Sequence, residues 1–201
     1  MPVPRREIVE PIIDKHRRVI VAAVQGGWAD WLASPHPGIW RCKRSRANFV
    51  WEQIIDRSHR AFDGMLGVRI IGSQATFGFL VDDQVFFRFK KGDENGLSAN
   101  VRTQLALAFH DHDQDLPDLL PRVERVEVVY QLNRLETQVV DIVVVARDRD
   151  VVVWTYSLLD AATGGMPLPM PVPSGQPPRL PASRLVRLRG ASDIRDWTKR
   201  G

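Results

Sequence analysis

The chain has 201 residues, of which 44% are hydrophobic, and this is enough for one domain with a sizeable core. Lys and Arg outnumber Asp and Glu by 28 to 24, so the net charge of +4 falls short of that of a dedicated nucleic-acid-binding protein. The single cysteine, Cys42, excludes an internal disulfide framework and a cysteine-based zinc finger.

The N-terminal segment and the most apolar run both argue against export and membrane insertion. Residues 1–6 lead into a charged amphipathic stretch and lack the apolar core of a signal peptide. A bilayer-spanning helix needs about 20 predominantly apolar residues. The run 139–154 does not meet this requirement, because it is interrupted by Asp141, Arg147, Asp148, Arg149 and Asp150. We therefore expect a cytoplasmic protein with no membrane partner.

The N-terminal third of the chain is predicted to be mainly helical. Residues 7–25 carry apolar side chains at a spacing of about 3.6 residues, which predicts a first helix that ends near Gly26 and Gly27. Residues 28–40 contain three of the six tryptophans and several breaker residues, so they predict a short helical turn followed by a loop. Residues 47–63 are predicted to form a further helix. A basic cluster precedes it and consists of Arg41, Lys43, Arg44 and Arg46.

From Val68 onward the composition changes to short runs of Val, Ile, Phe and Thr separated by turn residues, which is typical of strands. The segment 82–84 suits a hairpin turn, and so does the charged segment 147–150. The expected fold class is α+β, with N-terminal helices packed on an antiparallel sheet of about five or six strands. The predicted strands are 68–71, 76–81, 85–91, 123–132, 139–146 and 151–158.

The composition changes again at residue 161, where a proline-rich stretch begins. Proline removes backbone donors and holds the chain extended, so this stretch cannot form a regular core element. We expect a single domain over 1–160 and a proline-rich linker with a basic tail over 161–201. The tail is suited to weak contact with nucleic acid, and the alternative is a solvated, partly disordered terminus. Its basic residues are Arg179, Arg184, Arg187, Arg189, Arg195, Lys199 and Arg200.

The segment 86–110 combines an apolar strand, a polar turn and a short apolar stretch, and the rest of the chain can be interpreted as its support. In the turn, Asn and Gly permit positive φ, and acidic side chains can cap backbone donors. The stretch 104–109 reads Gln-Leu-Ala-Leu-Ala-Phe. The turn residues are Asp93, Glu94, Asn95 and Gly96.

The stretch 104–109 resembles the peptide with which bacterial replication and repair proteins dock onto the DNA polymerase sliding clamp. That resemblance implies that Gln104 is the polar anchor. It also implies that apolar side chains fill a pocket on the clamp, namely Leu105, Leu107 and Phe109. In the alternative interpretation, the same apolar side chains form a buried strand or one face of a core helix.

A broader resemblance links the chain to small bacterial proteins encoded beside a helix-turn-helix or zinc-peptidase-like partner in toxin–antitoxin loci, of the RosmerTA-like or SocB-like kind. It implies a growth inhibitor that its neighbour neutralises. SocB-like replication inhibitors act through the sliding clamp, which connects the two resemblances. The residues that carry it run from Phe87 to Leu158 through Asp93, Glu94, Asn95, Gly96, Ser98, Leu116, Pro117, Tyr130, Leu132, Asn133, Trp154 and Tyr156.

Two groups of residues contain the residue types of a metal site. His110, Asp111, His112 and Asp113 are consecutive, with Asp115 beyond them. On an extended segment the histidines and the aspartates point to opposite sides, so at most two of them converge. A magnesium-dependent nuclease needs clustered carboxylates and often a lysine, and such residues occur at Asp82, Asp83, Lys90, Lys91, Asp93 and Glu94.

The second group is divided by one predicted strand, which separates its acidic pairs by roughly 30 Å at about 3.3 Å per residue. We therefore predict no catalytic residue, no cofactor and no metal. The main hypothesis is a toxin-like growth inhibitor that binds proteins through 86–109, with a cognate antitoxin and the sliding clamp as partners. The alternatives are a metal-dependent nuclease or other nucleic-acid-processing enzyme, and an antitoxin that neutralises a cognate toxin.

Overall fold

The computed structural model describes residues 3–72, 77–93, 95, 97–98, 104–116, 119 and 121–159, except for the side chain of Leu105. These residues all belong to one compact unit, Met1–Gly165. The predicted linker and basic tail over 161–201 lie outside the described residues, as do Glu94 and Gly96 of the predicted turn.

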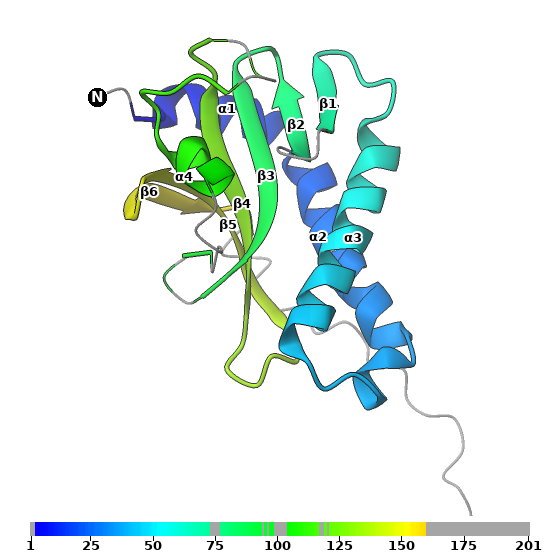
Figure 1. Ribbon diagram of the computed structural model, residues 1–201. Coiled ribbons are helices and arrows are strands. Elements are labelled where there is room, and N and C mark those ends of the chain that lie inside the picture. Colours follow the sequence, from blue (N-terminus) through cyan, green and yellow to red (C-terminus); the bar gives the residue numbers. More distant parts are fainter. Residues whose placement is uncertain are drawn as a thin grey trace, which may run out of the picture. The chain divides into compact units, whose positions relative to one another are not determined.

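Three helices, α1, α2 and α3, precede the sheet, in the part of the chain that was predicted to be mainly helical (Figure 1). The predicted first helix is divided at His16, and its second part continues past Gly26 and Gly27 to Ala33. None of the helices in the described part of the chain is long and apolar enough to cross a bilayer. The helical elements are α1 (Arg6–Lys15), α2 (Arg17–Ala33), the 3-10 helix η1 (His36–Gly38), α3 (Lys43–Phe62) and α4 (Gln104–His110).

Six strands form one sheet in the order β1-β2-β3-β4-β5-β6, which confirms the predicted α+β class and strand number. The prediction of an antiparallel sheet is wrong at one place, because β3 and β4 pair in parallel and the sheet is mixed. Parallel neighbours need a long crossover connection, usually with a helix, and the chain between β3 and β4 contains α4. The strands are β1 (Val68–Gly72), β2 (Phe77–Val81), β3 (Val85–Gly92), β4 (Glu124–Leu132), β5 (Val139–Asp148) and β6 (Val151–Ser157).

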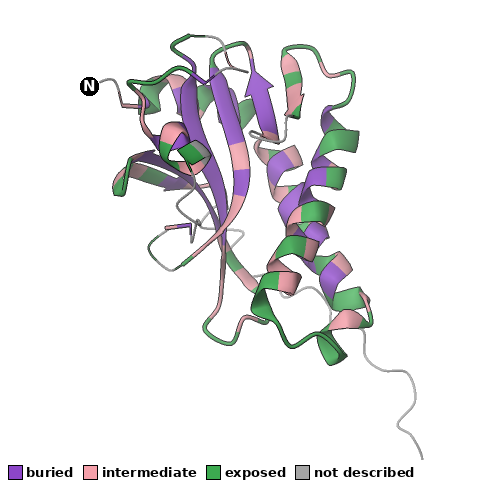
Figure 2. Cartoon of the chain, in the orientation of Figure 1, coloured by how far each residue is buried: buried purple, intermediate pink, exposed green. Residues whose placement is uncertain are grey.

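Both faces of the sheet are covered, so the central strands are buried along much of their length (Figure 2). On one face, side chains such as Phe79, Phe87 and Val128 form the main core with α1, α2 and α3. The opposite face carries a smaller apolar cluster under α4, in which Phe109 packs with Leu80, Phe86, Leu116 and Val123. Successive strand residues point to opposite faces, so this second cluster comes from the alternate positions of the same strands.

Gly27 lies where α2 and α3 approach each other closely. A Cβ on Gly27 would lie 2.7 Å from Ile54 Cγ1 and 2.9 Å from the Ile54 backbone nitrogen. The glycine therefore serves helix packing, and this is why the prediction that it ends the helix was wrong. Close by, Arg57 donates two hydrogen bonds to the Asp30 carboxylate, at 2.6 and 2.7 Å, and links the same two helices.

Candidate functional site

Helix α4 lies on the sheet face opposite the long helices, in front of β3 and β4 (Figure 1). Its predicted partner-binding residues do not share one environment. Gln104 is exposed and Leu107 is 45% exposed, whereas Phe109 is 2% exposed and belongs to the core under the helix. The side chain of Leu105 is outside the described residues. The structure therefore places the first and the last residue of the predicted motif on opposite sides of α4.

The turn after β3 is ordered around one carboxylate. Asp93 Oδ1 accepts hydrogen bonds from the backbone N–H groups of Asn95 and Leu97, each at 2.9 Å. The carbonyl of Asp93 also accepts a hydrogen bond from Gln131 Nε2 of β4. Asp93 thus stabilises the turn and links it to β4. Binding of a metal ion by the Asp93 carboxylate would compete with the hydrogen bonds that it accepts from Asn95 and Leu97.

A buried charged cluster lies beneath α4, centred on Glu127 of β4. Arg88 donates to Glu127 Oε1 from Nη2 at 2.8 Å and from Nε at 3.1 Å. The hydroxyl of Ser98 donates to Glu127 Oε2 at 2.8 Å and accepts from Arg147 Nη1 at 3.2 Å. We call this group the Glu127 cluster, and its members are Arg88, Ser98, His110, Glu127 and Arg147, with His110 Nε2 3.5 Å from Glu127 Oε1.

The Glu127 cluster fastens α4 to the sheet through Arg88. The guanidinium carbon of Arg88 lies 3.6 Å from the centre of the Phe109 ring, a cation–π contact. Arg88 Nη2 also lies 3.3 Å from His110 Nε2. Because a guanidinium only donates, this contact is a hydrogen bond when His110 is neutral and Nε2 accepts. One strand residue therefore contacts two consecutive residues of the helix.

The C-terminal end of α4 is held by Arg125 of β4. Its guanidinium donates to the carbonyl oxygens of Ala108 and Asp111, at 3.0 and 2.7 Å. The last carbonyls of a helix lack partners within the helix, so these bonds satisfy groups that would otherwise be buried without one. The carbonyl of His110 in turn accepts from the backbone N–H of Arg149. The helix is thus attached to the strand ends by directed polar contacts as well as by apolar packing.

The charges in the Glu127 cluster are strongly coupled. Burial alone raises the pKa of Glu127, but the contact with His110 together with the positive charge and hydrogen bonds of Arg88 outweighs burial and holds the pKa far below its ordinary range. Burial lowers the pKa of His110, and the neighbouring Glu127 offsets only part of that effect. The cluster at neutral pH is therefore an ionised glutamate between two arginines with a neutral histidine beside them.

The chain matches no known protein family, no curated protein and no solved structure. The case for a function therefore depends on the geometry of the site.

The consecutive residues His110, Asp111, His112 and Asp113 do not converge. His110 faces the Arg88–Glu127 pair, and His112 Nε2 lies 2.7 Å from the carbonyl oxygen of Arg147. Within the described parts of the chain, no group of three or more His, Cys, Asp or Glu side chains could hold a metal ion. The predicted acidic pair at the other end of β3 is also engaged, since Asp82 pairs with Lys15 and Asp83 with Arg69.

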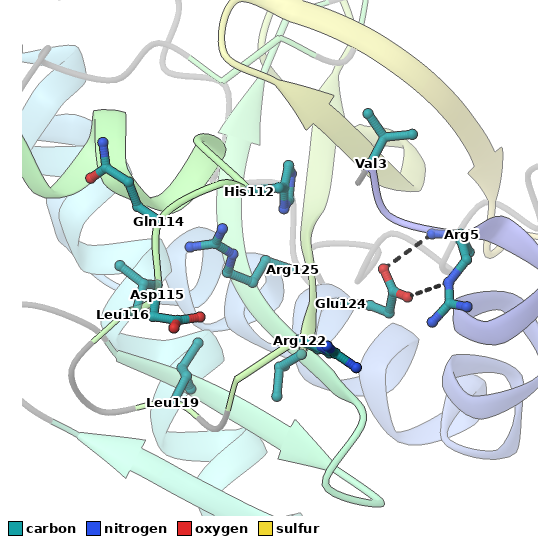
Figure 3. Close-up of a pocket in the computed structure, with 11 residues that line it drawn as sticks. Val3, Arg5, His112, Gln114, Asp115, Leu116, Leu119, Arg122, Glu124 and Arg125 are labelled. Atoms are coloured by element: carbon teal, nitrogen blue, oxygen red, sulfur yellow. Dashed lines mark hydrogen bonds and ion pairs between the residues drawn. The ribbon is translucent and has the colours of Figure 1, made fainter. Parts of the chain in front are cut away.

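A pocket of about 530 Å³ lies beside the loop that follows α4 (Figure 3). Its charged walls are largely committed to internal contacts. Arg5 donates to both carboxylate oxygens of Glu124, from its backbone N–H and from Nε, and Arg125 holds the end of α4. Its apolar wall is supplied by Leu116, Leu119 and Val123, and Arg122 and Asp115 complete the rim. Because Arg5, Glu124 and Arg125 are engaged in internal contacts and the rim residues Arg122 and Asp115 carry opposite charges, the walls do not present a set of charges for one kind of ligand.

Sequence reasoning did not single out the Glu127 cluster. The alternation of a strand puts Glu127 on the face opposite Val126 and Val128, but this pattern could not show that α4 covers that face. One signal was available, because Arg88 lies between Phe87 and Phe89 and Glu127 lies between Val126 and Val128. Charged residues at such positions are rarely buried unless they are paired with one another.

Acid is expected to weaken the fold through His110. Below about pH 6.5 an unfolded histidine takes up a proton, whereas folded His110 resists protonation because its pKa is lowered by burial. The unfolded state then binds more protons, so the free energy of unfolding should fall between pH 7 and pH 5. His110→Gln should reduce this decline without abolishing it, because burial also lowers the pKa of His16 and His112.

Denaturant titrations at both pH values would measure the effect in the wild type, in His110→Gln and in a control, His59→Gln. His59 is exposed on α3. An equal decline in all three proteins would show that His110 is not a source of the pH dependence.

Proposed function

We propose that the chain is the growth-inhibiting component of a bacterial toxin–antitoxin module, and that it acts in the cytoplasm by binding another protein through α4. The observation that carries this proposal is the orientation of the helix. Gln104 and Leu107 are exposed while Phe109 and His110 are buried against the sheet. Positions three apart share one face of a helix, so an amide and a leucine are presented together. An apolar side chain beside a polar anchor is a common mode of peptide recognition.

The sliding clamp is the partner suggested by the resemblance of 104–109 to clamp-binding peptides. Among the motif side chains that the structure describes, docking of α4 as it is folded would use Gln104 and Leu107. Use of Phe109 as well would require the helix to leave the sheet, because its ring packs against Phe86 and Arg88. The proposal therefore assigns recognition to Gln104 and Leu107, with Phe109 as the residue that fixes the helix in place.

The proposal predicts that Gln104→Ala combined with Leu107→Ala relieves growth inhibition when the chain is expressed. Loss of two anchor side chains should also weaken binding to purified sliding clamp by about tenfold or more. Growth curves and biolayer interferometry would measure the two effects, and circular dichroism would confirm that the fold persists. A matched control is Leu66→Ala with Gln84→Ala, which removes the same residue types from exposed positions away from α4.

The competing functions give different results in the same experiments. A nucleic-acid-processing enzyme would show chelator-sensitive cleavage by the purified chain, and Asp111→Ala or Glu94→Ala would abolish growth inhibition. An antitoxin would leave growth unaffected when expressed alone and would protect cells from a cognate toxin. Either result would replace the proposed function with the competing one. Equal growth inhibition by the α4 variant and the wild type would contradict binding through α4.

A further inference from the structure

A second surface, at the end of the unit where the α2–α3 connection meets the β4–β5 turn, combines exposed apolar side chains with an excess of positive charge. Figure 1 shows these two connections at the lower end of the unit, away from α4. They line a common pocket of about 280 Å³. We call this the hairpin-end surface, and its exposed apolar residues are Leu32, Ile39, Trp40 and Leu135, which are 53, 67, 40 and 80% exposed.

The apolar part of the hairpin-end surface is held by an aromatic cluster. Trp40 stacks on His36 with ring centres 4.0 Å apart and an angle of 9° between the ring planes. Phe49 of α3 lies edge-on to both His36 and Trp40. The buried Trp31 contacts the same group from α2. A surface fixed in this way loses little conformational entropy when a ligand binds, which favours recognition.

The charge of the hairpin-end surface is strongly unbalanced. Residues 31–46 contain four basic residues and no acidic one, and Glu136 is the acidic residue of the facing segment 131–138. Glu136 already forms ion pairs with Lys91, Arg46 and Lys43. The hydrogen bonds from Lys91 and Arg46 lower the pKa of Glu136 to about 2. Three further cations have no ion pair with any residue that the structure describes, and they are Arg41, Arg44 and Arg134.

We propose that the hairpin-end surface binds an acidic amphipathic segment of a partner protein. Apolar side chains of the partner would cover Leu32, Trp40 and Leu135, and its carboxylates would pair with Arg41 and Arg134. Charge complementarity requires an anionic ligand. A single-stranded nucleic acid fits less well, because base stacking needs exposed aromatic faces and three of the four exposed apolar residues are aliphatic. This inference does not depend on the proposed function of α4.

The test uses a fluorescein-labelled peptide of about twelve residues, with Leu and Phe at helical spacing i, i+3, i+4, i+7 and Asp or Glu at the other positions. Fluorescence anisotropy would compare it with a peptide in which Gln replaces every Asp and Glu, and with an oligothymidylate. The acidic peptide is expected to bind the full chain, and the Gln peptide at least tenfold more weakly. Arg41→Glu with Arg134→Glu should weaken binding of the acidic peptide by at least tenfold, and Trp40→Ala with Leu135→Ala should do the same.

The matched control for charge is Arg18→Glu with Arg60→Glu, which makes the same change in net charge at exposed positions away from the pocket. Cys42 lines the pocket and is the single cysteine of the chain, so its reaction with a maleimide reports on this site. The acidic peptide should slow that reaction in the wild type and not in Arg41→Glu with Arg134→Glu.

Four results would overturn the proposal. The first is a dissociation constant weaker than about 1 mM for the acidic peptide. The second is equal binding of the two peptides, and the third is an equal loss in the control variant. The fourth is tighter binding of the oligothymidylate that also depends on Arg41 and Arg134, which would make this end a nucleic-acid-binding surface.

Discussion

Glu127→Ala should lower the free energy of unfolding by about 3–5 kcal/mol, because it removes one partner of a buried ion pair and leaves the buried Arg88 charge without its carboxylate. Arg88 and Arg147 would then face each other beneath α4, with side chains only 13 and 8% exposed. The hydrogen bond from the Ser98 hydroxyl to Glu127 Oε2 would be lost in the same step. Urea denaturation at pH 7 would measure the loss. Glu52→Ala, at an exposed position of α3, is the control and should have little effect.

A triple variant separates unpaired charge from lost packing. Replacing Glu127, Arg88 and Arg147 together by leucine removes the charges along with their partner, and such exchanges are often neutral or stabilising in proteins. Most of the loss seen in Glu127→Ala should therefore be recovered. If the triple variant is as unstable as the single one, the cluster stabilises the fold through its shape and hydrogen bonds, and the electrostatic explanation fails.

Local periodicity was sufficient for most of the secondary structure. The apolar spacing of 7–25 and 47–63 predicted helices, and the Val- and Phe-rich runs from Val68 onward predicted six strands. The β2–β3 and β5–β6 turns were predictable because charged residues interrupt apolar runs there over two to four positions. Each of these predictions depends on contacts within an element or between adjacent elements, which a single sequence can encode.

The parallel pairing of β3 with β4 depends instead on a distant connection. The crossover between them contains α4, a helix of seven residues. So short an apolar stretch fits a strand, a helix or a docking peptide equally well. Its placement over the sheet depends on partners far along the chain, such as Arg88 of β3 and Arg125 of β4. For the same reason the sequence could not show that Phe109 is buried while Leu107 is exposed.

Gly27→Ala should destabilise the protein by about 1–2 kcal/mol, even though alanine is intrinsically the better helix former by about 1 kcal/mol. The added methyl group would lie 2.9 Å from the backbone nitrogen of Ile54, and backbone cannot move aside without separating α2 from α3. Gly26→Ala is the matched control. Its methyl group would meet the end of the Arg57 side chain, with the nearest atom, Nη1, at 2.7 Å, and a flexible side chain can give way. The free energy of unfolding of Gly26→Ala should be equal to that of the wild type or higher by up to about 1 kcal/mol.

Thermal and urea denaturation of both variants would distinguish two roles for the glycine pair. If the two substitutions behave differently, as expected, Gly27 is the point at which α2 and α3 touch, and the packing of these helices does not require a glycine at position 26. If both substitutions stabilise the protein, the helices can separate there at no cost, and the close approach contributes nothing to stability. If both destabilise it equally, the Arg57–Asp30 link is as tightly constrained as the Ile54 backbone, and the helix pair is fixed by a polar contact as much as by packing.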